Sequence, residues 1–164
     1  FIMKPKFVDD FLDKDTFKNL QTKMFNNTFP WFMEQGISDG RGIEKKEYFF
    51  THIIFKDWRI NSETFKDVLI ILNKLKVKSL LRIKGNLYIK TPTIVKHDLH
   101  TDYEFSHKAG LLCMNTNNGY TYFKDGTKIE SVENRMITFD AGEEHAGTSC
   151  SDENYRCNII FNYF

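Results

Sequence analysis

Cysteine and proline are scarce in this chain, with 3 residues of each among 164. The cysteines, Cys113, Cys150 and Cys157, are odd in number and form no C-x-x-C pair. These absences argue against a disulfide framework or a zinc knuckle, and a reducing compartment fits them better. We therefore expect a cytoplasmic protein. Low proline and alanine beside abundant Lys, Asn, Ile and Phe also indicate AT-rich coding DNA.

Long apolar runs are missing as well. The longest aliphatic run, Val68–Leu72, is far shorter than the roughly 20 residues that cross a bilayer. The segment Phe1–Pro5 is too short for the apolar core of a signal peptide. We expect no membrane association. Because the sequence does not begin with Met, we expect the natural terminus upstream.

The chain also lacks a charge excess of either sign. Charged residues make up 27% of it, yet the net charge is only +1. This balance gives no electrostatic footprint for nucleic acid. A 41% share of hydrophobic residues, including 16 Phe, can fill the core of a single domain, and aromatic rings suit sheets.

The first half of the sequence predicts two helices. One covers Lys14–Asn26, and the other starts at a cap on Asn61 or Ser62 and ends near Leu75. Their apolar stripes are Phe17, Leu20 and Met24 in the first helix, and Phe65, Val68, Leu69, Leu72 and Leu75 in the second. Between the helices, Tyr48–Phe55 is a predicted strand, and the charged, glycine-containing stretch Gln35–Lys46 is a predicted loop and candidate lid.

From about Val77 the hydrophobic period changes to two. Within Ser79–Ile89, the residues Arg82, Lys84, Asn86 and Tyr88 share one face, which suits a pocket wall better than a sandwich core. Gly85 indicates a bulge or a close approach of another segment. Further strands are predicted over Asp98–Asp102, Lys108–Asn115, Tyr120–Phe123, Lys128–Val132, Met136–Phe139, His145–Ser149 and Tyr155–Phe164.

Turn signals at Asn117–Gly119 and Lys124–Gly126 indicate hairpins between these short strands. The pattern predicts a mainly β (α+β) fold. We expect a double-stranded β-helix of the jelly-roll or cupin-like type with N-terminal helices packed outside. Residues 1–164 would form one domain, in which 1–76 support a β core over 77–164.

A candidate metal site begins at His100 and Asp102, which point to the same side of an extended segment. With His145, they supply two imidazoles and one carboxylate, a set that suits non-heme Fe(II) and leaves coordination positions open. A structural zinc site would need a fourth protein ligand. The alternative is that all three are ordinary surface residues. His97 and His107 are expected at the surface or at a substrate rim.

Arg156 lies further along the chain, with Asn158 on the same side of its strand. A buried arginine needs an anion, and its planar fork binds a carboxylate through two hydrogen bonds. Two readings stay open at this point. The anion is either an internal Asp140 or Glu143, or a bound dicarboxylate that spans the metal and Arg156.

Together these residues resemble the 2-oxoglutarate and Fe(II)-dependent dioxygenases, whose pattern is H-x-D, a distant H and then R. The resemblance implies that His100, Asp102 and His145 hold Fe(II), and that Arg156 grips the distal carboxylate of 2-oxoglutarate. Asn118–Phe123 is similar to the G-G-x-T-x-F hairpin of the prolyl-hydroxylase-like branch, with Asn118 replacing the first glycine.

A second similarity is to the AlkB-like nucleic-acid demethylases. Their N-x-Y and R-x-N pairs match Asn86 with Tyr88, and Arg156 with Asn158, but their later arginine has no match. The resemblance implies that Asn86, Tyr88 and Asn158 contact the cosubstrate. The run Asn134–Asp140 also looks like small phage-encoded members, which implies a location in the host-cell cytoplasm.

The resemblance implies that O₂ and 2-oxoglutarate are consumed, succinate and CO₂ are formed, and an unidentified substrate is hydroxylated. A protein side chain, a sugar or a small molecule is favoured over nucleic acid. Three alternatives stay open: an AlkB-like demethylase, a non-catalytic cupin-like or jelly-roll binding module, and a metal-dependent isomerase without the ketoacid. Arg156 argues against the isomerase, which needs no carboxylate clamp.

Overall fold

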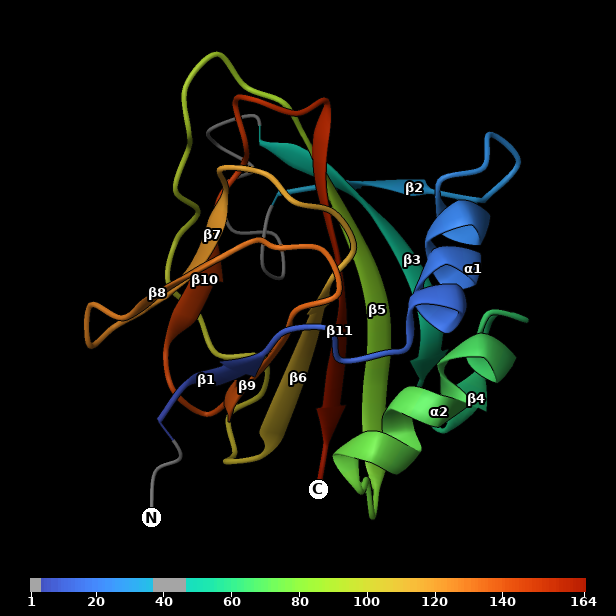
Figure 1. Ribbon diagram of the computed structural model, residues 1–164. Coiled ribbons are helices and arrows are strands. Elements are labelled where there is room, and N and C mark those ends of the chain that lie inside the picture. The colour runs from blue at the N-terminus through green and yellow to red at the C-terminus, as the bar shows by residue number, and fades with distance from the viewer. Residues whose placement is uncertain (1–3, 37–46) are drawn as a thin grey trace.

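A computed structural model describes residues 4–36 and 47–164. Within these residues the chain forms two antiparallel sheets and two helices (Figure 1). The strands are β1 (Lys6–Val8), β2 (Phe32–Gln35), β3 (Tyr48–Lys56), β4 (Arg59–Ile60), β5 (Leu80–Ile89), β6 (Lys108–Cys113), β7 (Tyr120–Phe123), β8 (Lys128–Glu130), β9 (Met136–Asp140), β10 (His145–Gly147) and β11 (Tyr155–Tyr163). The helices are α1 (Lys14–Met24) and α2 (Phe65–Leu75).

The larger sheet has the order β1-β9-β6-β11-β5-β3-β2, with β4 paired to β3, and the smaller sheet has the order β10-β7-β8. Both helices lie on the side of β3 and β5 in Figure 1, and the smaller sheet lies on the other side. The mainly β fold with helices outside is therefore confirmed. The proposed boundary between 1–76 and 77–164 stays a prediction, although β1 to β4 belong to the same sheet as β5 and β11.

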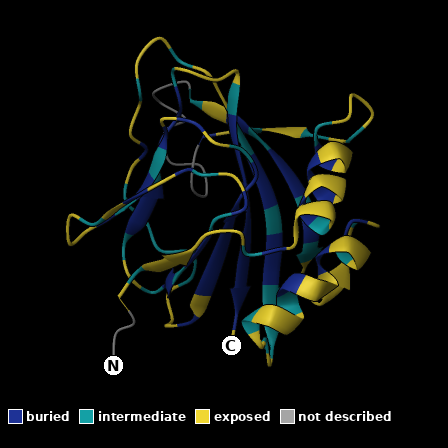
Figure 2. Cartoon of the chain, in the orientation of Figure 1, coloured by how far each residue is buried: buried dark blue, intermediate teal, exposed yellow. Residues whose placement is uncertain are grey.

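Two apolar clusters hold these layers together. One joins the helices to the larger sheet and includes Met24, Ile71 and Phe161. The other lies between the two sheets and includes Phe123 and Phe139. In Figure 2 the central strands are largely buried, whereas the helices show exposed outer faces. Burial on both faces stabilises the larger sheet as the rigid support of the pocket described below.

Helix α1 follows the predicted pattern. Its N-cap residue Asp13 accepts a hydrogen bond from the backbone N–H of Thr16 (2.9 Å), and Phe17, Leu20 and Met24 are buried. The helix packs closely on β5, because a Cβ atom added at Gly85 would lie 3.2 Å from both Met24 and Trp31. The close approach predicted as one reason for Gly85 is thus confirmed.

Helix α2 differs from its prediction at both the cap and the buried face. It begins at Phe65 after Thr64, which makes no side-chain cap hydrogen bond, and the proposed cap at Asn61 is wrong. Ser62 does cap the preceding turn, because its Oγ accepts a hydrogen bond from the backbone N–H of Thr64 (3.2 Å). Its fully buried residues are Val68 and Ile71, whereas Leu69 is 44% exposed. An unbroken aliphatic run gives no polar position to mark the outer face, so the sequence pattern could not orient the helix.

Most predicted strands are confirmed, but the segment Asp98–Asp102 is not a strand and forms only an isolated bridge between His100 and His145. Asn117–Gly119 does not close a hairpin either, since β6 and β7 belong to different sheets. The turn at Lys124–Gly126 does join β7 to β8, with Gly126 at φ +90°.

The segments β2 and β4 were not anticipated. Gln35, the first residue of the proposed lid, is the last residue of β2, and 37–46 lie outside the described residues. In the described part of the chain, no helix has the length and apolar character required to cross a bilayer.

Candidate metal centre and acid-binding pocket

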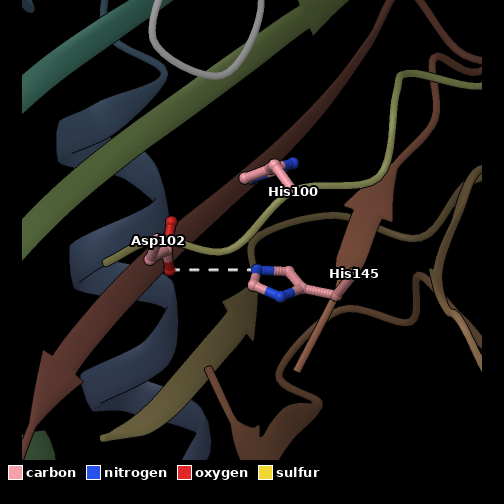
Figure 3. Close-up of side chains that lie close together, drawn as sticks. All are labelled: His100, Asp102 and His145. Carbon is pink, nitrogen blue, oxygen red and sulfur yellow. Dashed lines mark ion pairs between the residues drawn. The ribbon is translucent and has the colours of Figure 1, made fainter. Parts of the chain in front are cut away.

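The structure brings His100, Asp102 and His145 together (Figure 3). His100 and Asp102 lie on the irregular segment after β5, and His145 is the first residue of β10. Reciprocal backbone hydrogen bonds of 3.0 Å between His100 and His145 fix the two segments side by side. One ligand atom from each of the three side chains lies within 4.8 Å of the others.

Each imidazole is oriented by a backbone carbonyl. His100 Nδ1 lies 3.2 Å from the carbonyl oxygen of Asp98, and His145 Nδ1 lies 2.8 Å from that of Glu143. A carbonyl only accepts, so Nδ1 carries the hydrogen and Nε2 keeps the lone pair that a metal requires.

The spacing between ligands also suits an ion. His145 Nε2 lies 3.8 Å from Asp102 Oδ2, which is too long for a direct hydrogen bond. Two ligands of one metal with bonds of about 2.1 Å can lie up to about 4.2 Å apart. The donor types and the spacing therefore fit a metal ion better than a mutual hydrogen bond.

Asp102 is held by two donors from the larger sheet. Arg82 Nη2 donates to Oδ1 (2.8 Å), and Asn162 Nδ2 donates to Oδ2 (2.7 Å). Burial alone raises the pKa of the Asp102 carboxyl, but the charge of Arg82, with His145 and the Asn162 hydrogen bond, holds this pKa well below its usual range. Asp102 is therefore ionised at neutral pH, as a metal ligand must be.

The expected surface position of His97 and His107 is wrong, because only 5% of His97 and 3% of His107 is exposed, while their alternative place at a substrate rim stays a prediction. The His107 ring packs against Tyr103 and Phe105, with centroids 5.2 and 5.5 Å away. His97 packs against Tyr88 at 4.9 Å, and burial, with the charges of Arg156 and His100, lowers its pKa to about 4.

Arg156 is a buried cation with neutral partners. It is 1% exposed. Its Nε donates to Ser131 Oγ (2.8 Å), its Nη2 to Thr121 Oγ1 (2.9 Å) and its Nη1 to the carbonyl oxygen of Thr148 (3.3 Å). Thr121 lies in the Asn118–Phe123 motif, but the sequence did not predict its contact with Arg156. Ser131 and Thr148 lie in segments that carried no distinctive motif.

Among residues 4–36 and 47–164, no carboxylate forms an ion pair with Arg156. Asp140, one predicted internal partner, accepts hydrogen bonds from Ser106 instead. Glu143, the other, contributes its backbone carbonyl to His145. The predicted ion pairs with Asp140 and Glu143 are therefore not formed, and the buried guanidinium would be stabilised by a bound anion.

Two glycines make room for this side chain. A Cβ atom added at Gly147 would lie 2.8 Å from Arg156 Nη1. One added at Gly119 would lie 2.7 Å from Arg156 Cδ and 2.7 Å from the backbone oxygen of Ser149. Gly119 is thus required for close packing around Arg156, because a larger residue would collide with backbone as well as with the side chain.

The remaining predicted contacts line the strands beside Arg156. Tyr88 is the cross-strand partner of Arg156, and Asn86 is the partner of Asn158. Asn86 Nδ2 donates to Asn158 Oδ1 (3.0 Å), while the buried Asn86 Oδ1 has no hydrogen-bond partner within the described residues. Burial raises the pKa of Tyr88 to about 12, so its hydroxyl stays protonated.

One pocket contains all seven side chains that the sequence suggested. They are Asn86, Tyr88, His100, Asp102, His145, Arg156 and Asn158. Arg82, Lys84, Phe49 and Ile160 also line it. The alternating polar face of β5 could be found from the sequence, and the same alternation along β11 extends from Arg156 to Asn162, a residue that the sequence reading left unassigned.

Comparison with known proteins shows which solved structures have a similar fold. No protein-family model and no curated protein sequence matches the chain. Among solved structures, a prolyl-4-hydroxylase from Pseudomonas putida is 13% identical, with 97% of this chain and 91% of that chain covered and a TM-score of 0.62.

A prolyl hydroxylase from Trichoplax adhaerens, in complex with a peptide of the hypoxia inducible factor oxygen degradation domain, is 12% identical with a TM-score of 0.68. The match covers 97% of this chain and 83% of that one. A 2OG-Fe(II) oxygenase family oxidoreductase from Burkholderia pseudomallei is 10% identical, with coverages of 97% and 84% and a TM-score of 0.68. The chain therefore has the double-stranded β-helix fold of the 2-oxoglutarate and Fe(II)-dependent oxygenases.

Proposed function

We propose that this protein is an Fe(II)- and 2-oxoglutarate-dependent dioxygenase that hydroxylates an unidentified substrate. One observation carries the proposal: a buried guanidinium, which pairs with no carboxylate of residues 4–36 and 47–164, shares a pocket with a His-Asp-His cluster. Such a pocket matches a dicarboxylate that is bound at one end by a metal and at the other end by Arg156.

The donor set and the pocket fit these two ligands. His100, Asp102 and His145 would hold the ion and leave the other positions open. When bound, Fe(II) supplies the redox chemistry that couples decarboxylation of 2-oxoglutarate, with formation of succinate and CO₂, to hydroxylation of a C–H bond by O₂.

The chain's own residues bind and orient the diacid. Arg156 would hold its distal carboxylate through charge-assisted hydrogen bonds, and Tyr88 would support it with a protonated hydroxyl. Asn86 and Asn158, between Arg156 and the metal ligands along β5 and β11, provide amide groups at mid-pocket. The unpartnered Asn86 Oδ1 marks a position where a donor, such as an ordered water beside the diacid, would be favourable.

The substrate class stays open between a protein side chain, a sugar and a small molecule. Two of the three similar structures described above are prolyl hydroxylases, and one of these two is bound to a peptide. A net charge of +1 gives no support for nucleic acid. Substrate contacts in this fold would come from loops around the pocket.

The test is anaerobic purification, addition of Fe(II) and 2-oxoglutarate, exposure to O₂ and quantification of succinate. The wild-type protein should release succinate, and His100→Ala should abolish the release. Arg156→Ala should chiefly raise the KM for 2-oxoglutarate, by roughly 10- to 100-fold, because it removes charge-assisted hydrogen bonds. Arg135→Ala, which removes a largely buried arginine that pairs with Asp9 and does not line the pocket, is the matched control and should behave as wild type. Undiminished succinate release by His100→Ala would refute the proposal.

A further inference from the structure

Two residues that the site does not need as ligands, Arg82 and Asn162, donate hydrogen bonds to Asp102. Arg82 Nη2 donates to Asp102 Oδ1 (2.8 Å), and Arg82 Nε donates to Asn162 Oδ1 (3.1 Å). Asn162 Nδ2 donates to Asp102 Oδ2 (2.7 Å). The three side chains thus form a closed ring of hydrogen bonds in which both carboxylate oxygens are held from the side of the larger sheet.

His107 completes this network. Its Nδ1 lies 2.9 Å from the carbonyl oxygen of Phe105, so Nδ1 carries the hydrogen and Nε2 accepts. Asn162 Nδ2 lies 3.0 Å from His107 Nε2. This contact requires the NH₂ group of Asn162 to face His107 and Asp102, which leaves its oxygen for Arg82. The orientation of the amide is therefore determined by its neighbours.

The network is buried. Arg82 is 8% exposed, Asn162 is 0% exposed and His107 is 3% exposed. The rings of Tyr103 and Phe105 cover His107, and the Arg82 guanidinium lies 5.4 Å from the centre of the Tyr103 ring. Water competes little with such hydrogen bonds, so each one restrains its partner more strongly than a surface contact would.

The hydrogen-bond network orients the Asp102 carboxylate, because the backbone at Asp102 is irregular. The two imidazoles are oriented by nearby carbonyls of their own segments, and His145 also belongs to β10. Asp102 lies outside any strand, so its carboxylate depends on partners from β5 and β11 for its orientation. A freely rotating carboxylate could bind an ion through both oxygens and occupy a position that a second ligand needs.

We propose that Arg82, Asn162 and His107 are positioning residues that restrain Asp102 to bind the metal through a single oxygen. The proposal rests on the proposed function only in requiring that the His-Asp-His cluster binds a divalent metal. It assigns a role to His107 that is transmitted through Asn162, without contact between His107 and the metal.

The test measures Co(II) binding by calorimetry and by the visible absorption of the bound ion, with Co(II) as the probe in place of Fe(II). Arg82→Met and His107→Phe should each weaken Co(II) binding by roughly 10- to 100-fold, the usual effect of removing a residue that orients a ligand. Both should also change the Co(II) absorption spectrum, which reports coordination geometry rather than folding. His107→Gln, whose side-chain oxygen can accept from Asn162, should restore affinity and spectrum to within a few-fold of wild type.

Arg135→Met is the control, because it also removes an arginine from an Arg–Asp pair, at Asp9. It should leave Co(II) affinity and spectrum unchanged. If Arg82→Met does not fold, the comparison of His107→Phe with His107→Gln decides the question. Wild-type affinity and spectrum in His107→Phe would overturn the positioning role while leaving the proposed function intact. Failure of the wild-type protein to bind Co(II) would overturn both, whereas Co(II) binding without succinate release would count against the proposed function alone.

Discussion

The Arg156 side chain packs so closely on the backbone of Gly147 that one added methyl group would displace it. A methyl group at position 147 would lie 2.8 Å from Arg156 Nη1, closer than a carbon and a nitrogen can pack without displacement. We therefore predict that Gly147→Ala shifts the guanidinium and raises the KM for 2-oxoglutarate, by roughly 10-fold for the loss of about one charge-assisted hydrogen bond. Initial rates of succinate release over a range of 2-oxoglutarate concentrations would measure this.

The Co(II) affinity of Gly147→Ala should stay within a few-fold of wild type, since Gly147 carries no metal ligand. A KM equal to that of wild type would show that Arg156 does not bind the cosubstrate, or that the backbone moves enough to absorb the methyl group.

The burial of His97 predicts how the free energy of unfolding depends on pH. Burial, with the nearby charges of Arg156 and His100, lowers its pKa to about 4 in the folded protein, against about 6.5 in the unfolded chain. Below pH 6.5 the unfolded state takes up a proton that the folded state does not, so the free energy of unfolding falls as the pH drops from 6.5 towards 4. At pH 4.5 this costs about 2–3 kcal/mol.

The variant His97→Leu removes this titration. Between pH 7 and pH 4.5, the metal-free variant should therefore lose about 2–3 kcal/mol less stability than metal-free wild type. Urea unfolding of both proteins at the two pH values would measure the difference. Equal losses would show that His97 is protonated in the folded state or is not buried as described.

At the scale of the element, hydrophobic periodicity predicted that α2 is a helix but did not predict which face of it is buried. The aliphatic run Val68–Leu72 predicted a helix correctly but placed Leu69 on the buried face and left out Ile71, which is fully buried. We predict that Ile71→Ala lowers the free energy of unfolding by about 2–5 kcal/mol through loss of burial and creation of a cavity. Leu69→Ala, a deletion of similar size on the same helix, should cost less than about 1 kcal/mol.

Chemical denaturation of the two variants tests the orientation of the helix, because helix propensity changes little in either case. A larger loss in Leu69→Ala than in Ile71→Ala would mean that α2 is rotated about its axis relative to this description.

The strands β5 and β11 were more predictable than α2. Strict alternation in Arg82, Lys84, Asn86 and Tyr88 placed these residues on one polar face, and that face lines the pocket. Their partners across the sheet could not be predicted, because register depends on which strands pair. The hydrogen-bonded ring of Arg82, Asp102 and Asn162 could not be predicted from the sequence for this reason.

The segment Asp98–Asp102 shows the opposite case. It was predicted as a strand from its alternation, and the structure has only one bridge there. The same-side placement of His100 and Asp102 nevertheless holds in three dimensions. Backbone carbonyls and the donors from the larger sheet, rather than regular strand geometry, determine how these side chains converge.

At the scale of the whole molecule, the fold could be predicted from the series of short strands that follows two helices. The candidate metal ligands could be predicted from residue types at known spacing. The burial of His97 and His107 could not be predicted, because it depends on how irregular chain folds back: Tyr88 packs on His97, and Tyr103 and Phe105 pack on His107. Only the tertiary structure could show that Asp140 and Glu143 do not pair with Arg156, because it shows that both contact other groups.

A bound metal and diacid should stabilise the whole domain, because both would contact the folded state and not the unfolded chain. With free Co(II) and 2-oxoglutarate each at about 100 times their dissociation constants, the gain should be at least about 2.7 kcal/mol. Thermal unfolding should therefore show a higher Tm with both ligands than with either alone. A Tm that does not change with either ligand would indicate that the pocket binds neither.

The central claim is that His100, Asp102 and His145 share one iron ion while Arg156 binds the far end of a dicarboxylate. Crystals grown without oxygen in the presence of Fe(II) and 2-oxoglutarate, with diffraction recorded at the iron absorption edge, test it most directly. The account predicts one anomalous peak within bonding distance of all three side chains, and density for a diacid that extends from this peak to Arg156. A peak elsewhere, or no peak in a pocket that has the described geometry, would contradict it.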